Sequence, residues 1–185
     1  MAQRDPDADH PPAYRGNESF IFVSWSHADA TMVMPEIAAL NARGFRVYYD
    51  DAIHPGHDWH DELATAIAKC SLFVPFITPR WLASPTSQRE LKFALAQEKA
   101  LIAVHLEDTK LPAGVALAIG DRQAIHRTEL SELAYRQRFE DAVATFVAPI
   151  PPVAAPLEIS IPTAERLAGR SWFRQSRPEI GRAHV

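Results

Sequence analysis

Four apolar residues, Phe20-Ile21-Phe22-Val23, are followed at once by the polar run Ser24-Trp25-Ser26-His27-Ala28-Asp29. A short, continuous apolar run is typical of a strand that is buried on both faces, as in a parallel sheet. The amphipathic segment that follows has the rough spacing of a helix and stops at Gly44. A second strand is then expected at Phe45-Arg46-Val47-Tyr48-Tyr49. The first thirty residues of the globular part therefore predict a strand–helix–strand unit.

The same alternation continues along the chain. Further strands are expected at residues 72–77, 100–105 and 123–126. Helices are expected from Asp58 or Asp61 with Leu63, Ala66 and Ile67 inward, through Leu91, Ala94 and Leu95 after a short turn that follows Pro79, and through Leu133, Phe139, Val143 and Phe146. Strands that alternate with helices imply a parallel sheet with helices on both faces.

The composition limits the class of protein. The 185 residues suffice for one domain of about 100–150 residues plus tails. A net charge of −4 gives no electrostatic reason to expect nucleic-acid binding. Charged residues interrupt every apolar stretch, so no membrane span is expected. The single cysteine, Cys70, and an acidic N-terminus without a secretory signal favour the cytoplasm.

Two breaks divide the chain. Residues 1–18 are rich in proline and aspartate and are expected to be a flexible tail. The domain itself is expected at residues 19–148. Residues 149–185 begin with repeated prolines, which are typical of an extended linker, and are expected to continue into the truncated start of a further module.

Ligands of such sheets sit outside the carboxyl ends of the strands, and three segments are expected to meet there. The first, residues 24–29, offers either ordinary helix capping or hydroxyls and backbone N–H groups that hold a phosphate. The second, residues 50–62, contains three histidines among carboxylates but no known zinc spacing, so no metal is expected. The third leads to Glu90, which is either a charge at a helix start or a carboxylate that faces the cleft.

Taken together, these segments resemble a Toll/interleukin-1 receptor (TIR) domain of the bacterial type. The strand with Ser24-Trp25-Ser26-His27 resembles the first box of that family, and Gly44 to Asp50 with Gly56 and Trp59 resembles its second strand and long loop. Residues 76–84, leading to Glu90-Leu91, resemble the segment that carries the family's catalytic glutamate. The resemblance implies a flavodoxin-like three-layer α/β fold with a five-stranded parallel sheet in the order 2-1-3-4-5.

The resemblance also implies an activity, cleavage of NAD⁺ at the nicotinamide–ribose bond to nicotinamide and linear or cyclic ADP-ribose. NAD⁺ is then the substrate, and no cofactor is expected. Glu90 is the expected catalytic carboxylate, because an oxocarbenium-like transition state needs a nearby negative charge. The residues expected to contact the substrate are Ser24, Trp25, Ser26, His27, Asp51, Ile53, Gly56, Trp81 and Ser84. Residues 51–56 are the expected lid, because Gly56 permits motion and Pro55 limits it.

Activity in this family generally requires assembly, so homotypic TIR–TIR contacts, bacterial immune signalling and an unknown C-terminal effector or sensor module are also expected. Two alternatives stay open from the sequence. One is a non-catalytic scaffold that binds other TIR domains through residues 51–60. The other is a flavodoxin-type mononucleotide binder, for which Trp25-Ser26-His27-Ala28 is a poor phosphate loop. Glu90 favours the enzyme.

Overall fold

The computed structural model describes residues 11–50, 59–120 and 122–150. Five parallel strands form one sheet: β1 (Ile21–Ser24), β2 (Val47–Tyr49), β3 (Leu72–Ile77), β4 (Ile102–His105) and β5 (Gln123–His126). Their order across the sheet is β2-β1-β3-β4-β5. The flavodoxin-like topology expected from the sequence is therefore confirmed.

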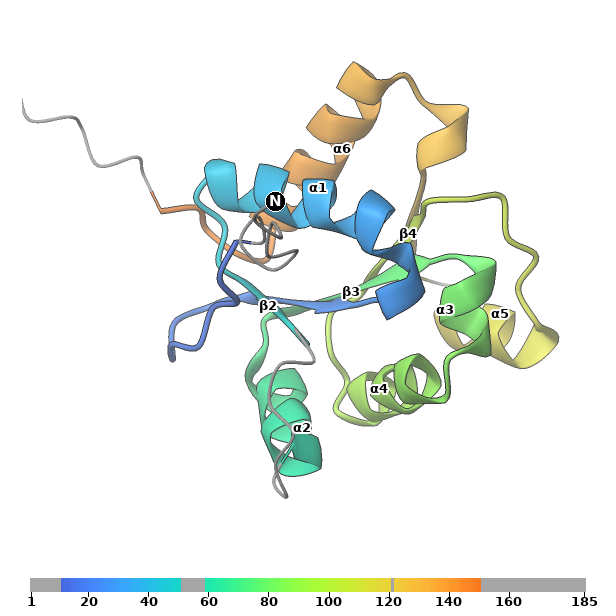
Figure 1. Cartoon of the computed structure of the whole chain (residues 1–185), viewed down its shortest axis with the longest axis horizontal. Coiled ribbons are helices and arrows are strands. Elements are labelled where there is room, and N and C mark those ends of the chain that lie inside the picture. The colour runs from blue at the N-terminus through green and yellow to red at the C-terminus, as the bar shows by residue number, and fades with distance from the viewer. Residues whose placement is uncertain (1–10, 51–58, 121, 151–185) are drawn as a thin grey trace, which may run out of the picture. The chain divides into compact units, whose positions relative to one another are not determined.

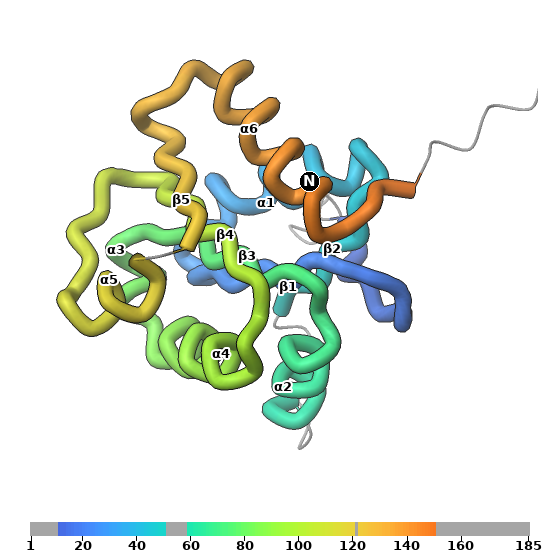
Figure 2. Tube along the Cα trace, turned by 180° about the vertical axis from the view of Figure 1, so that it is seen from behind, coloured from blue at the N-terminus to red at the C-terminus, as the bar shows by residue number. Residues whose placement is uncertain are grey.

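Helices cover both faces of this sheet (Figure 1). One face carries α1 (Ala30–Ala42) and α6 (Glu132–Ala144), and the other carries α2 (Trp59–Lys69) and α4 (Pro85–Ala96). The short helices α3 (Pro79–Ala83) and α5 (Ala113–Ile119) and the single 3₁₀ turns η2 (His27–Asp29) and η3 (Arg127–Glu129) lie in the connections. Figure 2 shows the same arrangement from behind, with β5 at the edge opposite β2.

Side chains of each strand alternate between two cores. Ile21, Val23 and Val74 pack in the core that α1 and α6 cover, whereas Phe22 and Phe73 pack in the core beside α2 and α4. Because strand side chains alternate with a period of two, each inner strand contributes apolar residues to both layers, and polar side chains (Ser24 and His105) stand only at the carboxyl ends of β1 and β4. By this alternation Ser24 lies on the α4 side of the sheet and Trp25 on the α1 side.

The ends of the described domain are held against β2, α2 and the turn that follows α1. The Tyr14 N–H donates to the Val47 carbonyl at 2.8 Å, and the Arg15 guanidinium pairs with Glu62 on α2. Residues 11–18, which were expected to belong to the N-terminal tail, thus include a contact with β2, and residues 1–10 lie outside the described residues. At Gly44 the φ angle is +85°, and a Cβ there would lie 2.3 Å from the Ile150 carbonyl oxygen.

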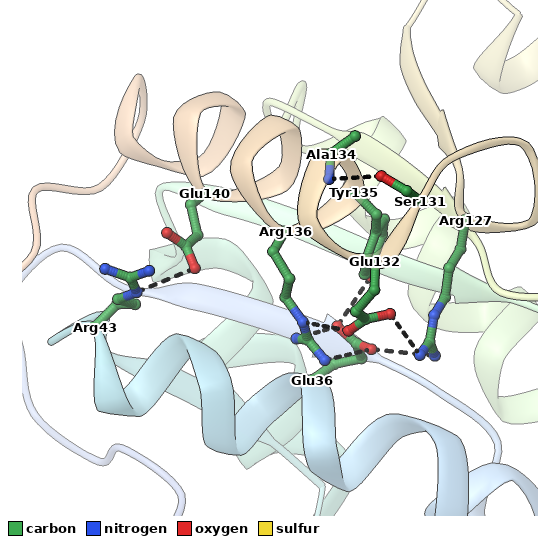
Figure 3. A network of polar contacts seen from close by, with 9 residues as sticks. All are labelled: Glu36, Arg43, Arg127, Ser131, Glu132, Ala134, Tyr135, Arg136 and Glu140. Carbon is green, nitrogen blue, oxygen red and sulfur yellow. Dashed lines mark hydrogen bonds and ion pairs between the residues drawn. The ribbon is translucent and has the colours of Figure 1, made fainter.

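A buried ion cluster joins α1 to α6 (Figure 3). The Glu36 side chain is fully buried and accepts from Tyr135 Oη at 3.0 Å and from Arg136 Nη1 at 2.7 Å. Arg127 Nη1 lies 3.2 Å from the other carboxylate oxygen of Glu36. These contacts fix the α1–α6 layer on the face of the sheet away from α2 and α4.

Two details of the last helices differ from the sequence prediction. Leu133 and Phe146, which the expected last helix included, are 70% and 39% exposed: Tyr135, Phe139, Ala142 and Val143 form the inward face of α6, and Phe146 lies beyond its end. The helix α5 was not predicted; it begins after Pro112 and contains Gly114, and Leu117 on it is 88% exposed. A short, largely exposed helix leaves little periodic signal in the sequence.

The chain divides into two units, Met1–Pro152 and Val153–Val185, and the second lies wholly outside the described residues. None of the helices in the described ranges combines the length and the apolar character that a bilayer crossing requires.

Candidate active site

Glu90 lies on α4 and points toward the carboxyl end of β1. It is the sixth residue of a helix that begins at Pro85, so it lies beyond the first turn and is not a helix-start charge. Glu90 is only 6% exposed, and its Oε2 accepts a hydrogen bond from Ser24 Oγ at 2.5 Å. The structure thus brings the predicted catalytic carboxyl to the end of the first strand.

Ser24 is held in turn by Trp81 on α3. The Trp81 Nε1–H donates to Ser24 Oγ at 3.0 Å, and the Trp81 side chain is completely buried. An indole N–H can only donate, so Ser24 accepts from Trp81 and its own proton is free to go to the Glu90 carboxylate. Trp81, predicted as a substrate contact, therefore supports Ser24 from behind.

Electrostatics make Glu90 unusual among the carboxyls of this domain. Burial raises the pKa of Glu90 to about 8; the Ser24 hydrogen bond opposes this rise, and the Asp50 carboxylate at the end of β2 adds to it. Among the described residues, no arginine or lysine forms an ion pair with Glu90, so nothing there neutralises an ionised Glu90. A carboxyl in this state gains strongly from any positive charge that a ligand brings.

A cavity of about 240 Å³ opens beside Glu90, between α2 and α4. Its walls come from one face of each helix, with the i, i+3, i+4, i+7 spacing that places side chains in a row. These residues are His60, Leu63, Ala64 and Ile67 on α2, and Thr86, Arg89, Glu90 and Phe93 on α4. The site therefore combines an apolar slot, one buried carboxyl, and polar groups from His60, Thr86 and Arg89.

Two further residues predicted to contact the substrate lie apart: Ser84 is at the start of α4, and the Trp25 ring is on the α1 side of the sheet. Ser84 caps α4 by accepting from the Ser87 N–H at 3.2 Å, and Ser87 Oγ in turn donates to the Trp25 carbonyl at 3.4 Å. The Trp25 ring, by contrast, packs against the α1-side core, 4.8 Å from the His27 ring and nearly perpendicular to it. The structure does not bring that ring to the cavity that Glu90 lines.

Ser26 and His27 also lie at the strand end rather than in the cavity. Ser26 precedes η2 and makes no capping hydrogen bond, and His27 Nε2 lies 3.3 Å from the Asp50 carbonyl oxygen. Asp51, Ile53 and Gly56, with the lid predicted over residues 51–56, lie outside the described residues. Within the ranges that are described, no three His, Cys, Asp or Glu side chains are grouped as metal ligands would be.

Sequence reasoning missed several residues of this site. Asp29, predicted as a possible helix cap, is 1% exposed and makes no capping hydrogen bond. Instead its carboxylate accepts from Thr78 Oγ1 at 2.5 Å and pairs with Arg80. The cavity face of α4 had a readable signal, because Thr86, Arg89, Glu90 and Phe93 follow helical spacing. The contacts of Asp29 had none, since Thr78 is 49 residues away along the chain.

These features, a five-stranded parallel sheet with a buried acidic site at its carboxyl edge, define a flavodoxin-like α/β domain. A model of the TIR domain family matches residues 21–145, more than half of the chain. The chain therefore belongs to the TIR domain family. No curated protein matches it significantly by sequence.

Solved structures show the same fold. The TIR domain of the Toll-related receptor TRR-2 from Hydra magnipapillata superimposes with a TM-score of 0.54 and 12% identity, covering 65% of this chain and 95% of that one. The CMP N-glycosidase BcmB from Clostridium botulinum superimposes with a TM-score of 0.50 and 18% identity, covering 67% of this chain and 99% of that one. The RPS4 and RRS1 TIR domain heterodimer superimposes with a TM-score of 0.50 and 17% identity, covering 70% of this chain and 99% of that one. At these identities the likeness is one of fold.

Proposed function

We propose that this TIR domain cleaves the nicotinamide–ribose bond of NAD⁺, releasing nicotinamide and linear or cyclic ADP-ribose. The observation that carries the proposal is the buried carboxyl of Glu90, which has a single hydroxyl partner, Ser24, and lines an open cavity. A structural glutamate in a core is normally paired with a cation, as Glu36 is. Glu90 lacks such a partner among the described residues, which suits a site that receives positive charge from a ligand.

The chemistry of NAD⁺ matches this electrostatic state. Its pyridinium ring already carries a positive charge and leaves as neutral nicotinamide, so no general acid is needed. As the bond breaks, positive charge develops on the ribose, and a carboxylate beside the ring stabilises that oxocarbenium-like state. Glu90 is the expected stabilising group, and the Ser24 hydroxyl holds one of its oxygens so that the other is directed to the sugar.

The raised pKa of Glu90 gives the site a preference for cationic substrates. With a pKa of about 8, roughly a tenth of the free site is ionised at pH 7. A bound pyridinium favours the carboxylate and lowers this pKa, so binding of the cationic nucleotide and ionisation of Glu90 reinforce each other. A neutral nucleoside gains nothing from this coupling.

The cavity has the size for part of the substrate. About 240 Å³ with apolar walls from Leu63, Ile67 and Phe93 suits one planar heterocycle rather than a whole dinucleotide. The rest of NAD⁺ would then extend past the rim, where Arg89 and His60 offer groups that bind phosphate. The similar fold of BcmB supports the reaction class, since that protein is described as a CMP N-glycosidase.

We further propose that self-association activates the domain, in bacterial immune signalling. The similar fold of the RPS4 and RRS1 heterodimer supports contacts between TIR domains. The domain is then active when other TIR domains, or a C-terminal module, bring copies together. We place the protein in the cytoplasm, where NAD⁺ is available and where the lone, buried Cys70 stays reduced.

The experiment is an NAD⁺ consumption assay on the domain clustered by tethering to beads. Wild type should consume NAD⁺ and release nicotinamide, and Glu90→Gln should not. Glu98→Gln is the matched control, because it makes the same chemical change just beyond the end of α4 at an exposed position, and it should retain activity. If clustered wild type leaves NAD⁺ intact while TIR–TIR association is measurable, the scaffold is the correct function.

A further inference from the structure

Two pairs of hydrogen bonds, joined through the covalent frame of Trp81, link Glu90 to a second buried carboxylate, Asp29. The Asp29 Oδ2 accepts from Thr78 Oγ1 at 2.5 Å, and the same Thr78 oxygen accepts from the Trp81 backbone N–H at 3.0 Å. On the far side of Trp81, the indole donates to Ser24 and Ser24 donates to Glu90. Residues from η2, β3's end, α3, β1 and α4 are thereby connected.

When Glu90 is ionised, the direction of every proton in these contacts is fixed by the groups themselves. Asp29 as a carboxylate can only accept, so the single Thr78 proton goes to it and a Thr78 lone pair faces the Trp81 N–H. Trp81 donates in both directions, from its backbone toward Thr78 and from its indole toward Ser24. Ser24 is left with one proton, and its place is on Glu90. Each group therefore has one orientation.

Asp29 makes contacts that a helix cap does not require. It is 1% exposed, it forms no capping hydrogen bond to α1, and Arg80 pairs with its second oxygen. The Arg80 Nη2 also reaches Glu107 after β4 at 2.7 Å. Asp29 is consequently a fixed anion, held from two sides, whose remaining contact is the Thr78 hydroxyl that starts α3.

On the basis of the proposed function, we propose that Asp29 and Thr78 are positioning residues for Glu90, acting through Trp81 and Ser24 without contacting the substrate. Asp29 orients the Thr78 hydroxyl, Thr78 fixes the first turn of α3, and that turn places the indole that holds Ser24. The Ser24 hydrogen bond both aims the Glu90 carboxyl and favours its ionised form.

Thr78→Val removes the connecting hydroxyl with little change of shape. Ser24 then loses its fixed orientation, and its support for the ionised form of Glu90 weakens. We expect kcat to fall about 10-fold with KM nearly unchanged, less than the ~10²-fold that a 1 Å misplacement can cost. The rising limb of the pH–rate profile should move to higher pH. Thr78→Ser keeps the hydroxyl and should stay within about twofold of wild type.

Ser131→Ala is the matched control for lost stability. Ser131 caps α6 as Thr78 caps α3, by accepting from the Ala134 N–H, and it lies in the opposite layer. Both substitutions delete an N-cap hydroxyl, so both should lower the melting temperature, but only Thr78→Val should move the pH profile. Asp29→Asn, which keeps an oxygen that accepts from Thr78 but removes the charge, should give a smaller shift in the same direction.

Titration of Glu90 by carboxyl ¹³C NMR gives a readout that does not depend on turnover. The charged or titratable groups that face Glu90 are Asp50 on the β2 end, His60 on α2 and Arg89 on α4, and none of these is changed. The titration midpoint of Glu90 should rise in Thr78→Val and stay unchanged in Ser131→Ala. In wild type, the Trp81 indole N–H signal should change over the same pH range as the Glu90 carboxyl signal. A wild type that does not consume NAD⁺ overturns the proposed function. The positioning role is overturned if the titration midpoint of Glu90 is unchanged in a folded Thr78→Val variant, or if the Trp81 indole N–H signal does not change as Glu90 titrates.

Discussion

Glu36 and Glu90 are both buried glutamates on helices that pack on the same sheet, yet their surroundings are opposite. Around Glu36 lie Arg127, Arg136 and the Tyr135 hydroxyl, on the α1–α6 face (Figure 3). Glu90 has one hydroxyl partner and a neighbouring carboxylate, on the α2–α4 face. Burial raises the pKa of both, but Arg136, Tyr135 and Arg127 oppose the rise at Glu36, whereas Ser24 alone opposes it at Glu90.

The difference shows what separates a structural carboxyl from a functional one. Burial by itself marks neither, since both residues are less than 10% exposed. A carboxylate whose charge is balanced within the fold contributes to the cohesion of two helices. A carboxyl without that balance destabilises the fold when it ionises, and it is retained where a ligand supplies the missing charge.

The largest effect on stability is expected from Glu36→Ala. The change leaves the buried Tyr135 hydroxyl without its acceptor and removes one carboxylate from two arginines, which retain Glu132. The free energy of unfolding should fall by about 3–5 kcal/mol, as for other broken buried ion pairs. Urea unfolding at pH 7 measures it, and the folded variant should keep its activity per molecule. A loss of unfolding free energy of no more than about 1 kcal/mol, as for a surface ion pair, would show that the cluster does not stabilise the fold.

Glu90→Gln should change the free energy of unfolding in the opposite direction and stabilise the fold. Because the folded pKa of Glu90, about 8, lies above the ordinary value of 4.5, the stability associated with its neutral form is complete below pH 4.5 and is lost as the pH rises through 8. Glutamine cannot ionise and still accepts from Ser24. The variant should match wild type near pH 4.5 and exceed it by about 2–4 kcal/mol at pH 7.

Thermal or urea unfolding of the Glu90→Gln variant across this pH interval is the measurement. Glu98→Gln, at an exposed position, provides the baseline and should track wild type at every pH. A Glu90→Gln variant that is less stable than wild type at pH 8 would mean that Glu90 is stabilised as an anion in the fold, as a structural ion pair is.

A smaller effect is expected from Arg127→Gln. The Arg127 side chain is 32% exposed, and Arg136 continues to bind Glu36 through two nitrogens after the change. The free energy of unfolding should fall by at most about 1 kcal/mol, because a partly exposed ion pair contributes little. The same urea titration measures it. A loss as large as that of Glu36→Ala would assign the main share of the cluster to Arg127 instead of Arg136.

Much of this molecule could be predicted from its sequence because local patterns carry the relevant physics. The five strands were expected near their observed positions, since runs such as Leu72–Ile77 are apolar throughout, and Gly44 marked the end of α1. The family resemblance to TIR domains, confirmed by the family model, directed attention to Glu90. Its burial and its bond to Ser24 depend on β1 and α4 meeting in space.

The parts that could not be predicted arise from contacts between distant residues. Nothing around Glu36 in the sequence indicates that Arg127 and Arg136, about ninety to a hundred residues later, surround it. The ring of Trp25 was expected beside the substrate, but the alternation of the strand directs it to the α1 layer. Trp81 was expected to contact the substrate, but its side chain is fully buried and donates to Ser24.

The most direct test of the central claim is the rate of nicotinamide release by clustered wild type as a function of pH, with Glu90→Gln measured in parallel. If ionised Glu90 stabilises the departing cation, kcat/KM should rise with pH and level off above an apparent pKa near 8, and Glu90→Gln should release no nicotinamide at any pH. A wild type that releases none, or a Glu90→Gln variant that retains the same rising profile, would contradict the assignment of Glu90 as the catalytic carboxylate.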